Sequence, residues 1–468
     1  MKKIKSNNNK LVEKIKFSRI TKLKFFSYIF LSISLILCSI IDFLDYHPFR
    51  EEIENRLLEE AKLRISLIRK GTILLDFGIG NASKYVYIHQ INHHFKFGSN
   101  FFQYNYFPTN DLNEKYEQLF CALFNYATIP FYWSVYEPQE NNYAYLERLH
   151  NMTSFLISNN ISIKGHPIVW QYNNTIPDWL LNKTLIAQQN KTLEHIQHVL
   201  SNFTEIKIWD LLNEPLHVNN SWLGRNQYET WIAALEKARS LRNDTQFIIN
   251  EYNILDTSSI NNYFIESDID KYYNLIKSIK NNGYSPDAIG FQFHSTDKWV
   301  STSHIINTLD KFADFKIPLH ITEFIPGSKG FYQGGIKRGK ITPETQAEYA
   351  EKIYTILFSH PAVYAITWWD FATNARWRAW KEDLGGYMMD SLGNILPVYD
   401  RLYELIHQEW NSTCYTKLDE NGRLEFTGFY GDYYISIYDG PTIYFSIVDN
   451  RTTEEKPWKI SDVEQLFI

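Results

Sequence analysis

The segment IKIWDLLNEP, residues 206–215, contains the pattern that decides the fold of this chain. A short apolar run is followed at once by the polar pair Asn213 and Glu214, as expected of a strand that is buried on both faces and ends at a polar edge. Comparable runs recur at intervals of roughly 30 to 46 residues, and each interval has room for an amphipathic helix such as 185–200 or 343–359. These runs are FKFGSNF (95–101), ATIPFYW (127–133), IKGHPIVW (163–170), QFIINEY (246–252), AIGFQFH (288–294), IPLHITEF (317–324) and AVYAITWWD (362–370).

Eight such βα repeats predict an α/β protein with a closed (β/α)8 barrel, a TIM barrel. A doubly wound sheet is the alternative for near-continuous apolar strands, but it usually has a glycine-rich phosphate-binding turn after its first strand. No such turn follows residues 95–101. The sequence therefore favours the barrel, with its active-site face at the carboxyl ends of the strands.

Further elements are expected on both sides of the repeats. Residues 47–94 contain an amphipathic helix, ended by Gly71, and two strand-like runs, which predict a helix plus a two-strand β segment. The catalytic barrel is expected to occupy residues 95–410. Beyond it, period-two runs such as RLEFTGFY and GDYYISIYD predict a small β-module at 411–468, whose strands could pair with those of residues 72–90.

The N-terminal region has the charge pattern of a membrane-targeted chain. A lysine-rich tail, residues 1–24, precedes seventeen uncharged residues, FFSYIFLSISLILCSII (25–41), which is close to the shortest length of a membrane-spanning helix. Lysines before the apolar run favour a signal anchor with the rest of the chain extracellular or lumenal, and a cleaved signal sequence leading to secretion is the alternative. N-x-S/T sequons such as those at Asn151, Asn202 and Asn411 fit a glycoprotein on this route.

The composition is that of a large folded chain and argues against several classes of protein. The 468 residues carry 47 basic and 53 acidic side chains, and the net charge of −6 gives no sign of a nucleic-acid partner. Three cysteines, Cys38, Cys121 and Cys414, are too few for a disulfide scaffold or a zinc site built from cysteines. Aromatic residues are abundant at 16%, and because aromatic rings stack on sugars as well as filling cores, this content leaves a carbohydrate ligand open.

Two carboxylates among the polar residues at the strand ends point to a reaction. Glu214 ends the fourth strand and Glu323 the seventh, so both should project into one cleft from opposite sides of the barrel. Glycoside hydrolysis requires such a pair, one group to protonate the leaving oxygen and one to meet the oxocarbenium-like centre. A metal site built from His166, Glu214, His294 and Glu323 is the main rival, but neither an H-x-H nor an H-E-x-x-H pair occurs to favour it.

Several of these segments resemble glycoside hydrolase family 10, a family of retaining xylanases. WDLLNEP (209–215) and ITEF (321–324) are similar to its two catalytic strands, and GHPIVW (165–170) and DAIGFQFH (287–294) are similar to two more of its strands, in the same order. The resemblance covers nearly the whole barrel. It implies a (β/α)8 enzyme that hydrolyses internal β-1,4-glycosidic bonds of a β-linked polysaccharide such as xylan, without a metal or an organic cofactor.

Carried over residue by residue, the resemblance implies that Glu214 is the general acid/base and that Glu323 is the nucleophile that forms a glycosyl-enzyme. His294 is expected to orient Glu323. Asparagine and histidine side chains would bond the sugar hydroxyls, and tryptophans would wall the site. The remaining substrate-binding residues implied in this way are Asn213, His166, Gln292, Trp170, Trp369 and Trp377.

One motif departs from the family. After the second strand the family has Glu-Asn, then Lys before the Trp of W-x-x-x-E-P, and these groups grip the sugar beside the cleaved bond. Here Tyr132 precedes Trp133, and no Glu, Asn or Lys lies between Thr128 and Trp133. We therefore expect hydrolysis with altered recognition, in which Tyr132 and Trp133 stack on the sugar instead. Hydrolysis of another β-glycan or a smaller β-glycoside is the alternative, and a non-catalytic carbohydrate-binding barrel is a third.

Overall fold

The computed structural model describes residues 48–217, 226–256, 267–373 and 384–464, and the chain divides into two compact units, 1–56 and 57–468. The tail 1–24, the hydrophobic run 25–41 and Trp377 lie outside the described residues. Among the residues that are described, no helix is both long enough and apolar enough to cross a bilayer.

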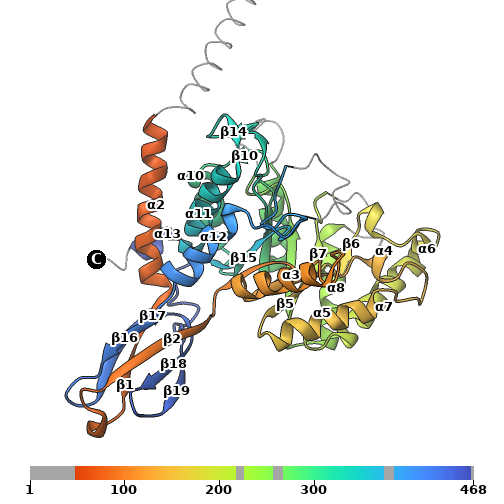
Figure 1. Cartoon of the computed structure of the whole chain (residues 1–468). Coiled ribbons are helices and arrows are strands. Elements are labelled where there is room, and N and C mark those ends of the chain that lie inside the picture. The colour runs from red at the N-terminus through yellow and green to blue at the C-terminus, as the bar shows by residue number, and fades with distance from the viewer. Residues whose placement is uncertain (1–47, 218–225, 257–266, 374–383, 465–468) are drawn as a thin grey trace, which may run out of the picture. The chain divides into compact units, whose positions relative to one another are not determined.

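Eight parallel strands close into a barrel (Figure 1), which confirms the expected (β/α)8 fold. Each strand pairs with the next along the chain, and the last returns to pair with the first. In chain order the strands are β3 (Lys96–Asn100), β4 (Tyr126–Pro130), β5 (Ser162–His166), β7 (Ile208–Asn213), β8 (Gln246–Glu251), β9 (Ala288–Phe293), β11 (Leu319–Phe324) and β15 (Val363–Trp368). Every predicted strand segment overlaps one of them, and β4 and β5 each begin one residue earlier than predicted.

The predicted segment 163–170 is divided into two strands. β5 ends at His166, and the short β6 (Val169–Trp170) pairs further along β7, with Trp170 opposite Asn213. Pro167 lies between them, and because proline has no N–H to donate, it interrupts a ladder of hydrogen bonds. The break places Trp170 at the rim of the barrel.

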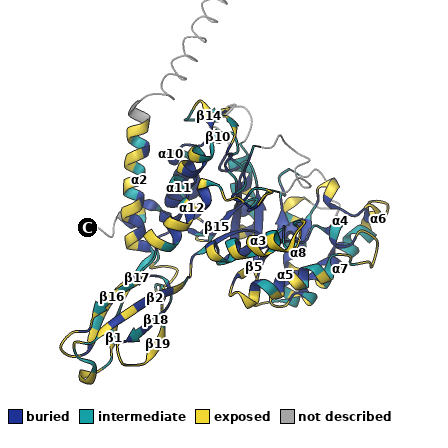
Figure 2. Cartoon of the chain, viewed as in Figure 1, coloured by how far each residue is buried: buried dark blue, intermediate teal, exposed yellow. Residues whose placement is uncertain are grey.

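Helices cover the barrel between successive strands, and Figure 2 shows their exposed outer faces around buried strands. Six of them begin after a Ser, Thr or Asn whose side chain accepts a hydrogen bond from the first helical turn, which satisfies a backbone N–H that would otherwise be unpaired. The longer helices between barrel strands are α3 (Asn110–Leu123), α5 (Leu146–Ser158), α7 (Leu185–Asn202), α8 (Gln227–Leu241), α9 (Asp268–Asn281), α10 (Thr302–Ala313) and α11 (Pro343–Ser359). In the chain, α2 (Pro48–Ile68) precedes the barrel strands and α12 (Pro397–Glu404) follows them.

The interior of the barrel is filled by side chains in layers. Tyr126, Ile208, Ala288 and Ala365 come from the second, fourth, sixth and eighth strands and form one buried cluster with Ile248. Alternate strands supply such layers because neighbouring strands of a tilted barrel are staggered. The interior is therefore a packed core, and a substrate can only be bound at the strand ends.

The flanking β elements form a module with a hydrophobic core of its own. The expected pairing between residues 72–90 and the C-terminal strands is present, because β1 pairs with β17 and β2 lies between β16 and β18. One sheet contains β1 (Lys70–Asp76) and β17 (Arg423–Phe429), and the other, in spatial order, β16 (Cys414–Lys417), β2 (Tyr85–His93), β18 (Gly431–Ile437) and β19 (Thr442–Ile447).

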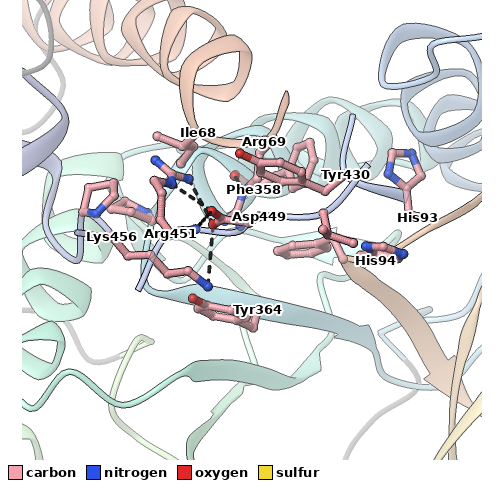
Figure 3. Close-up of a pocket in the computed structure, with 14 residues that line it drawn as sticks. Ile68, Arg69, His93, His94, Phe358, Tyr364, Tyr430, Asp449, Arg451 and Lys456 are labelled. Atoms are coloured by element: carbon pink, nitrogen blue, oxygen red, sulfur yellow. Dashed lines mark hydrogen bonds and ion pairs between the residues drawn. The ribbon is translucent and has the colours of Figure 1, made fainter. Parts of the chain in front are cut away.

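Arg69 links this module to the barrel. Its guanidinium donates three hydrogen bonds to backbone oxygens between residues 358 and 363, around the end of α11 and the start of β15. Beside Arg69 lies a pocket (Figure 3) in which Asp449 accepts hydrogen bonds from Arg451 and forms an ion pair with Lys456. The acceptors of Arg69 are fixed backbone groups, so they hold the module firmly against the barrel.

Candidate active site

Both predicted catalytic glutamates lie at the carboxyl ends of the barrel strands. Glu214 directly follows β7, and Glu323 is the penultimate residue of β11. Glu323 is buried, with 3% of its surface exposed, and Glu214 is partly buried. The side-chain amides of Gln292, Asn213 and Asn250 form a chain of hydrogen bonds that leads from Glu214 to Glu323, so the two carboxyl groups lie in one cleft.

The backbone at both glutamates departs from regular strand geometry. Leu211 in β7 and Thr322 in β11 are positions at which the register against neighbouring strands shifts. Bulges of this kind re-aim side chains beside active sites. Glu214 has a φ of +54°, in the left-handed region that side chains other than glycine rarely adopt, and its N–H donates to the backbone oxygen of Asn250 at 2.8 Å. Such backbone strain clusters at functional sites, where surrounding contacts maintain it.

Burial and two neighbouring donors control the protonation of Glu214. Trp170 Nε1 donates to Oε2 and Gln292 Nε2 donates to Oε1, each at 3.0 Å. Burial raises the pKa of Glu214 to about 8, the hydrogen bond from Gln292 acts in the opposite direction, and the charge of Glu323 adds to the rise. Glu214 is therefore mostly protonated at neutral pH, as a general acid must be.

Glu323 is held by an imidazole and an amide. His294 Nε2 lies 3.0 Å from Oε2, and Asn250 Nδ2 donates to Oε1 at 3.3 Å. Burial opposes a charge on the imidazole, but the hydrogen bond to Glu323 and the charge of that carboxylate raise the pKa of His294. The two donors fix the orientation of the carboxylate, which is what a nucleophile in a positioned site needs.

Asn213 connects the surroundings of the two glutamates. Its Oδ1 accepts hydrogen bonds from Asn250 Nδ2 at 2.9 Å and from Gln292 Nε2 at 3.3 Å. The Nδ2 of Asn213 is buried and has no hydrogen-bond partner among the described residues. Leaving a buried donor unpaired is costly, so this amide is suited to a hydroxyl that a bound sugar would supply.

The side chain of His166 is oriented by the buried ion pair between Asp210 and Lys164. Its Nδ1 lies 2.7 Å from Asp210 Oδ2, and Lys164 forms an ion pair with the same oxygen at 2.7 Å. Burial by itself would raise the pKa of Asp210, but Lys164 and His166 hold it below its usual range. The other ring nitrogen of His166 lies 3.9 Å from Glu323 Oε1, so it faces the cleft.

Aromatic rings form one wall beside these polar groups. The ring of Tyr132 lies 5.7 Å from His166 and 5.9 Å from Trp170, and Trp369 lies 5.4 Å from His166. Phe102 packs edge-on against both Tyr132 and Trp369. The structure thus brings Trp170, Trp369 and Tyr132 to the site, and it adds Phe102, which the sequence did not indicate.

Trp133 does not belong to that wall, and the expectation that it stacks on sugar is wrong. Its ring stacks on His195 at 4.1 Å, its Nε1 donates to Glu137 at 2.8 Å, and it is 6% exposed. Trp133 starts the short helix α4 (Trp133–Tyr136), and Tyr132 is the residue directly before it. Neighbouring residues at a helix start point in different directions, so only Tyr132 reaches the cleft.

Comparison with known proteins identifies the family. The profile of glycosyl hydrolase family 10 matches residues 88–404, well over half of the chain. This chain belongs to glycosyl hydrolase family 10. The resemblance seen in the strand motifs is therefore confirmed, and with it the prediction of a glycosidase.

Proteins similar to this chain include xylanases and an anti-sigma factor. Endo-1,4-beta-xylanase B of Thermotoga neapolitana is 29% identical over 56% of this chain and 75% of that protein. The anti-sigma-I factor RsgI6 of Acetivibrio thermocellus is 25% identical over 81% of this chain and 46% of that protein. Endo-1,4-beta-xylanase 1 of Arabidopsis thaliana is 24% identical over 81% of this chain and 38% of that protein. This chain therefore spans less than half the length of each of these two relatives. Among solved structures, xylanase 10B from Thermotoga petrophila RKU-1 in complex with xylobiose has a TM-score of 0.56 at 25% identity, covering 68% of this chain and 95% of that one.

The structure adds two residues to this family 10 site, Asn250 and Thr322. Asn250 contacts both Asn213 and Glu323, and Thr322 Oγ1 donates to Asn250 Oδ1 at 2.6 Å. A Cβ at Gly290 would come within 2.5 Å of that amide oxygen, so glycine leaves the room that Asn250 needs. Asn250 lies near the end of the predicted strand QFIINEY, so the rule that pointed to the other strand ends could have found it. Thr322 faces the site only because of the bulge.

The rival metal site has little support in this arrangement. Within the described ranges, no group of three His, Cys, Asp or Glu side chains is placed to hold a metal ion. Glu214 receives an indole and an amide donor, and Glu323 an amide and an imidazole. Hydrogen-bond donors around a carboxylate suit acid and nucleophile chemistry.

Replacing Gln292 with leucine should move the alkaline limb of the pH profile to higher pH. The hydrogen bond from Gln292 lowers the pKa of Glu214, so its loss raises that pKa above its present value of about 8. In the role expected of Glu214, a general acid works only while protonated, so the rate should fall as pH rises through this pKa. The measurement is kcat/KM on a xylo-oligosaccharide across pH, with leucine at the exposed Gln333 as a control that should leave the limb in place. A shift to lower pH would contradict this account.

Proposed function

We propose that this chain is a retaining glycoside hydrolase that cleaves internal β-1,4-glycosidic bonds of a xylan-type polysaccharide. The observation that carries the proposal is the pair of unlike carboxyl groups in one cleft: Glu214 is partly buried and has a raised pKa, and Glu323 is oriented by His294 and Asn250. When their environments give two neighbouring carboxyl groups different pKa values, one can act as the acid and the other as the nucleophile. The endo-1,4-beta-xylanases among the relatives support the choice of substrate.

In the first step, a carboxylate oxygen of Glu323 attacks the anomeric carbon while the glycosidic carbon–oxygen bond breaks. Glu214 gives its proton to the leaving oxygen, so the departing chain carries a hydroxyl and the sugar is esterified to Glu323. The free amide donor of Asn213 is placed to bond a hydroxyl of the same sugar. His294 keeps its contact with Glu323 as the charge on that group disappears.

In the second step, water attacks the anomeric carbon and the ester bond to Glu323 breaks. Glu214, now ionised, takes a proton from the water, which restores both carboxyl groups. Each step inverts the anomeric centre, so the product keeps the β configuration.

The direct test is the configuration of the first product. Proton NMR of a xylo-oligosaccharide digest should show the β anomer of the new reducing end before mutarotation. Retention implies carboxyl groups roughly 5 to 5.5 Å apart, whereas an initial α anomer would require roughly 6.5 to 9.5 Å and would contradict the proposed nucleophile. A digest that releases no sugar from any β-glycan would favour the non-catalytic alternative.

The family's Glu, Asn and Lys after the second strand are absent here, and their absence predicts weak discrimination between sugars. Hydrogen bonds to charged groups contribute roughly 1.5 to 3 kcal/mol each, so losing two or three lowers transition-state binding by several kcal/mol, about a thousandfold in rate. Tyr132 occupies this side of the cleft, and ring stacking tolerates different hydroxyl patterns. Steady-state kinetics on matched aryl glycosides should show a preference for xylose over glucose of less than about a thousandfold. A larger preference would show that other residues rebuilt the subsite.

We also propose that residues 25–41 bring the catalytic barrel to an extracellular or lumenal location, as a signal anchor. The proposal rests on the uncharged run and the lysines before it. N-terminal sequencing of the native protein should find residues preceding Phe25. A mature chain that starts near residue 42 would instead indicate a cleaved signal and a secreted enzyme.

A further inference from the structure

The outward face of the four-stranded sheet in the β-module carries clustered aromatic rings. Side chains alternate along each strand, so one set faces the core and the next set faces solvent. In β2 the core receives Val86 and Ile88, and in β18 it receives Tyr433 and Ile435. The opposite set, which we call the tyrosine face, contains Tyr85, Tyr87, His89, Tyr415, Tyr434 and Tyr444.

These rings are exposed to an unusual degree. Tyr444 is 73% exposed, Tyr415 65% and Tyr85 50%. Single exposed aromatic residues are ordinary, but a contiguous exposed group marks a surface that binds something. The core of the module is complete without them, because it is formed by the inward set and by the second sheet.

The rings are in contact across all four strands. Tyr85 stacks on Tyr415 at 5.3 Å with an interplanar angle of 4°, and Tyr415 is the cross-strand partner of Tyr87. Tyr87 lies 6.2 Å from Tyr434, which in turn lies 6.2 Å from its partner Tyr444. The tyrosine face is therefore one continuous platform. It is set on strands whose register is fixed, so the rings are already in place before any ligand arrives.

The charge of this surface indicates the kind of ligand. Lys417 lies over the ring of Tyr85, and Asp432 pairs with His94 at 3.1 Å, so the charges at the outward positions of these strands are few and balanced. Hydroxyl groups also lie on this side, such as Ser436 bonded to Thr442. Nucleic acids and anionic membranes are attracted by clusters of Lys and Arg. A neutral surface of rings and hydroxyls is instead complementary to a neutral, polyhydroxylated ligand.

We propose that the tyrosine face is a second binding surface for a β-linked glycan chain. A pyranose ring presents C–H groups to the negative face of an aromatic ring, and its hydroxyls reach the phenol and serine groups around it. The identity of the glycan rests on the proposed function of the barrel, whereas the surface itself does not depend on the catalytic residues. Attachment of a polymer here raises its local concentration at the cleft, which matters most for an insoluble substrate.

The test measures binding separately from catalysis. Full-length protein carrying Glu323→Gln, which cannot digest the polymer, is mixed with insoluble xylan, and the unbound fraction is measured with and without Tyr87→Ala, Tyr415→Ala and Tyr444→Ala together. A ring contact corresponds to a factor of roughly two to ten in affinity, so the triple change should weaken retention about tenfold or more. Tyr403→Ala is the matched control, because Tyr403 is 38% exposed, as Tyr87 is at 39%, but lies on α12. The control should retain wild-type binding.

The active enzyme with the same three changes should keep its kcat/KM on a soluble aryl β-xyloside within twofold and its unfolding temperature within a few degrees. If the triple variant fails to fold, Tyr444→Ala alone, at the most exposed ring, should weaken retention, while Tyr444→Phe should preserve it. Unchanged retention in the alanine variants would overturn the proposal, as would a concentration-dependent dimer that these changes abolish, because the face would then bind a second copy. If the triple change weakens polymer retention but the unchanged chain hydrolyses no glycoside, the result would support the tyrosine face as a binding surface and would contradict the proposed reaction.

Discussion

Replacing Glu323 with alanine should lower kcat on a xylo-oligosaccharide by about four orders of magnitude or more. In the proposed reaction this residue supplies the atom that attacks the anomeric carbon, and removing a covalent nucleophile usually costs at least this much. His294 and Asn250, which hold its carboxylate, remain in place but have nothing to orient. Substrate binding should change little, so kcat falls far more than KM rises.

Azide makes this prediction specific to the nucleophile. In the Glu323→Ala enzyme, azide can enter the vacated space and attack an activated aryl glycoside, while Glu214 still protonates the leaving group. A single displacement produces an α-glycosyl azide. The control is Glu348→Ala, an exposed glutamate on α11 whose change should leave kcat within twofold. An alanine variant at 323 that keeps more than about one hundredth of the rate would exclude Glu323 as the nucleophile.

Replacing Glu214 with alanine should produce a loss that depends on the leaving group. General acid catalysis contributes about 10² to 10⁴ in rate, and a natural sugar needs a proton to depart. Activated dinitrophenyl glycosides depart without one, so their first step should be nearly unaffected. The alkaline limb that follows the pKa of Glu214, about 8, should also vanish from the pH profile.

Azide also distinguishes the acid/base role proposed for Glu214 from the nucleophile role proposed for Glu323. In the Glu214→Ala enzyme it replaces the water that Glu214 would have activated, and it attacks the glycosyl-enzyme on Glu323 to produce a β-glycosyl azide. Azide products of opposite configuration in the two variants would assign both residues. An equal loss on natural and activated substrates would contradict the assignment of Glu214 as the acid.

Local patterns in the sequence predicted the barrel and the positions of the two glutamates. A strand buried on both faces needs a continuous apolar run, and the polar residue that follows it must lie at the carboxyl edge of the sheet. For this reason IKIWDLLNEP and IPLHITEF place Glu214 and Glu323 at one face without any knowledge of their contacts. Trp170 and Trp369 were predicted from the resemblance of their segments to the family.

Side-chain direction was predicted less well, because it depends on geometry within one or two residues. Trp133 and Tyr132 are adjacent in sequence, yet one packs on His195 and the other faces the cleft. Thr322 reaches the site through the register shift in β11, which moves it to the face that Glu323 shares. No pattern of apolar and polar residues encodes such shifts, since each reverses the face to which a side chain belongs.

The sequence by itself therefore determined the eight-stranded barrel, the two carboxyl groups and the family motifs, all of which follow from local periodicity and short spacings. Only the tertiary structure decided that burial raises the pKa of Glu214 to about 8. It also decided that Gln292, Asn213 and Asn250 form a chain of amide hydrogen bonds between the glutamates. The meeting of tyrosines from four strands on one face of the sheet is likewise a result of strand pairing. Protonation and contact depend on atoms that the closed barrel and the paired strands bring together from segments far apart in the chain. Their distances are set by strand register and desolvation, which no single segment contains.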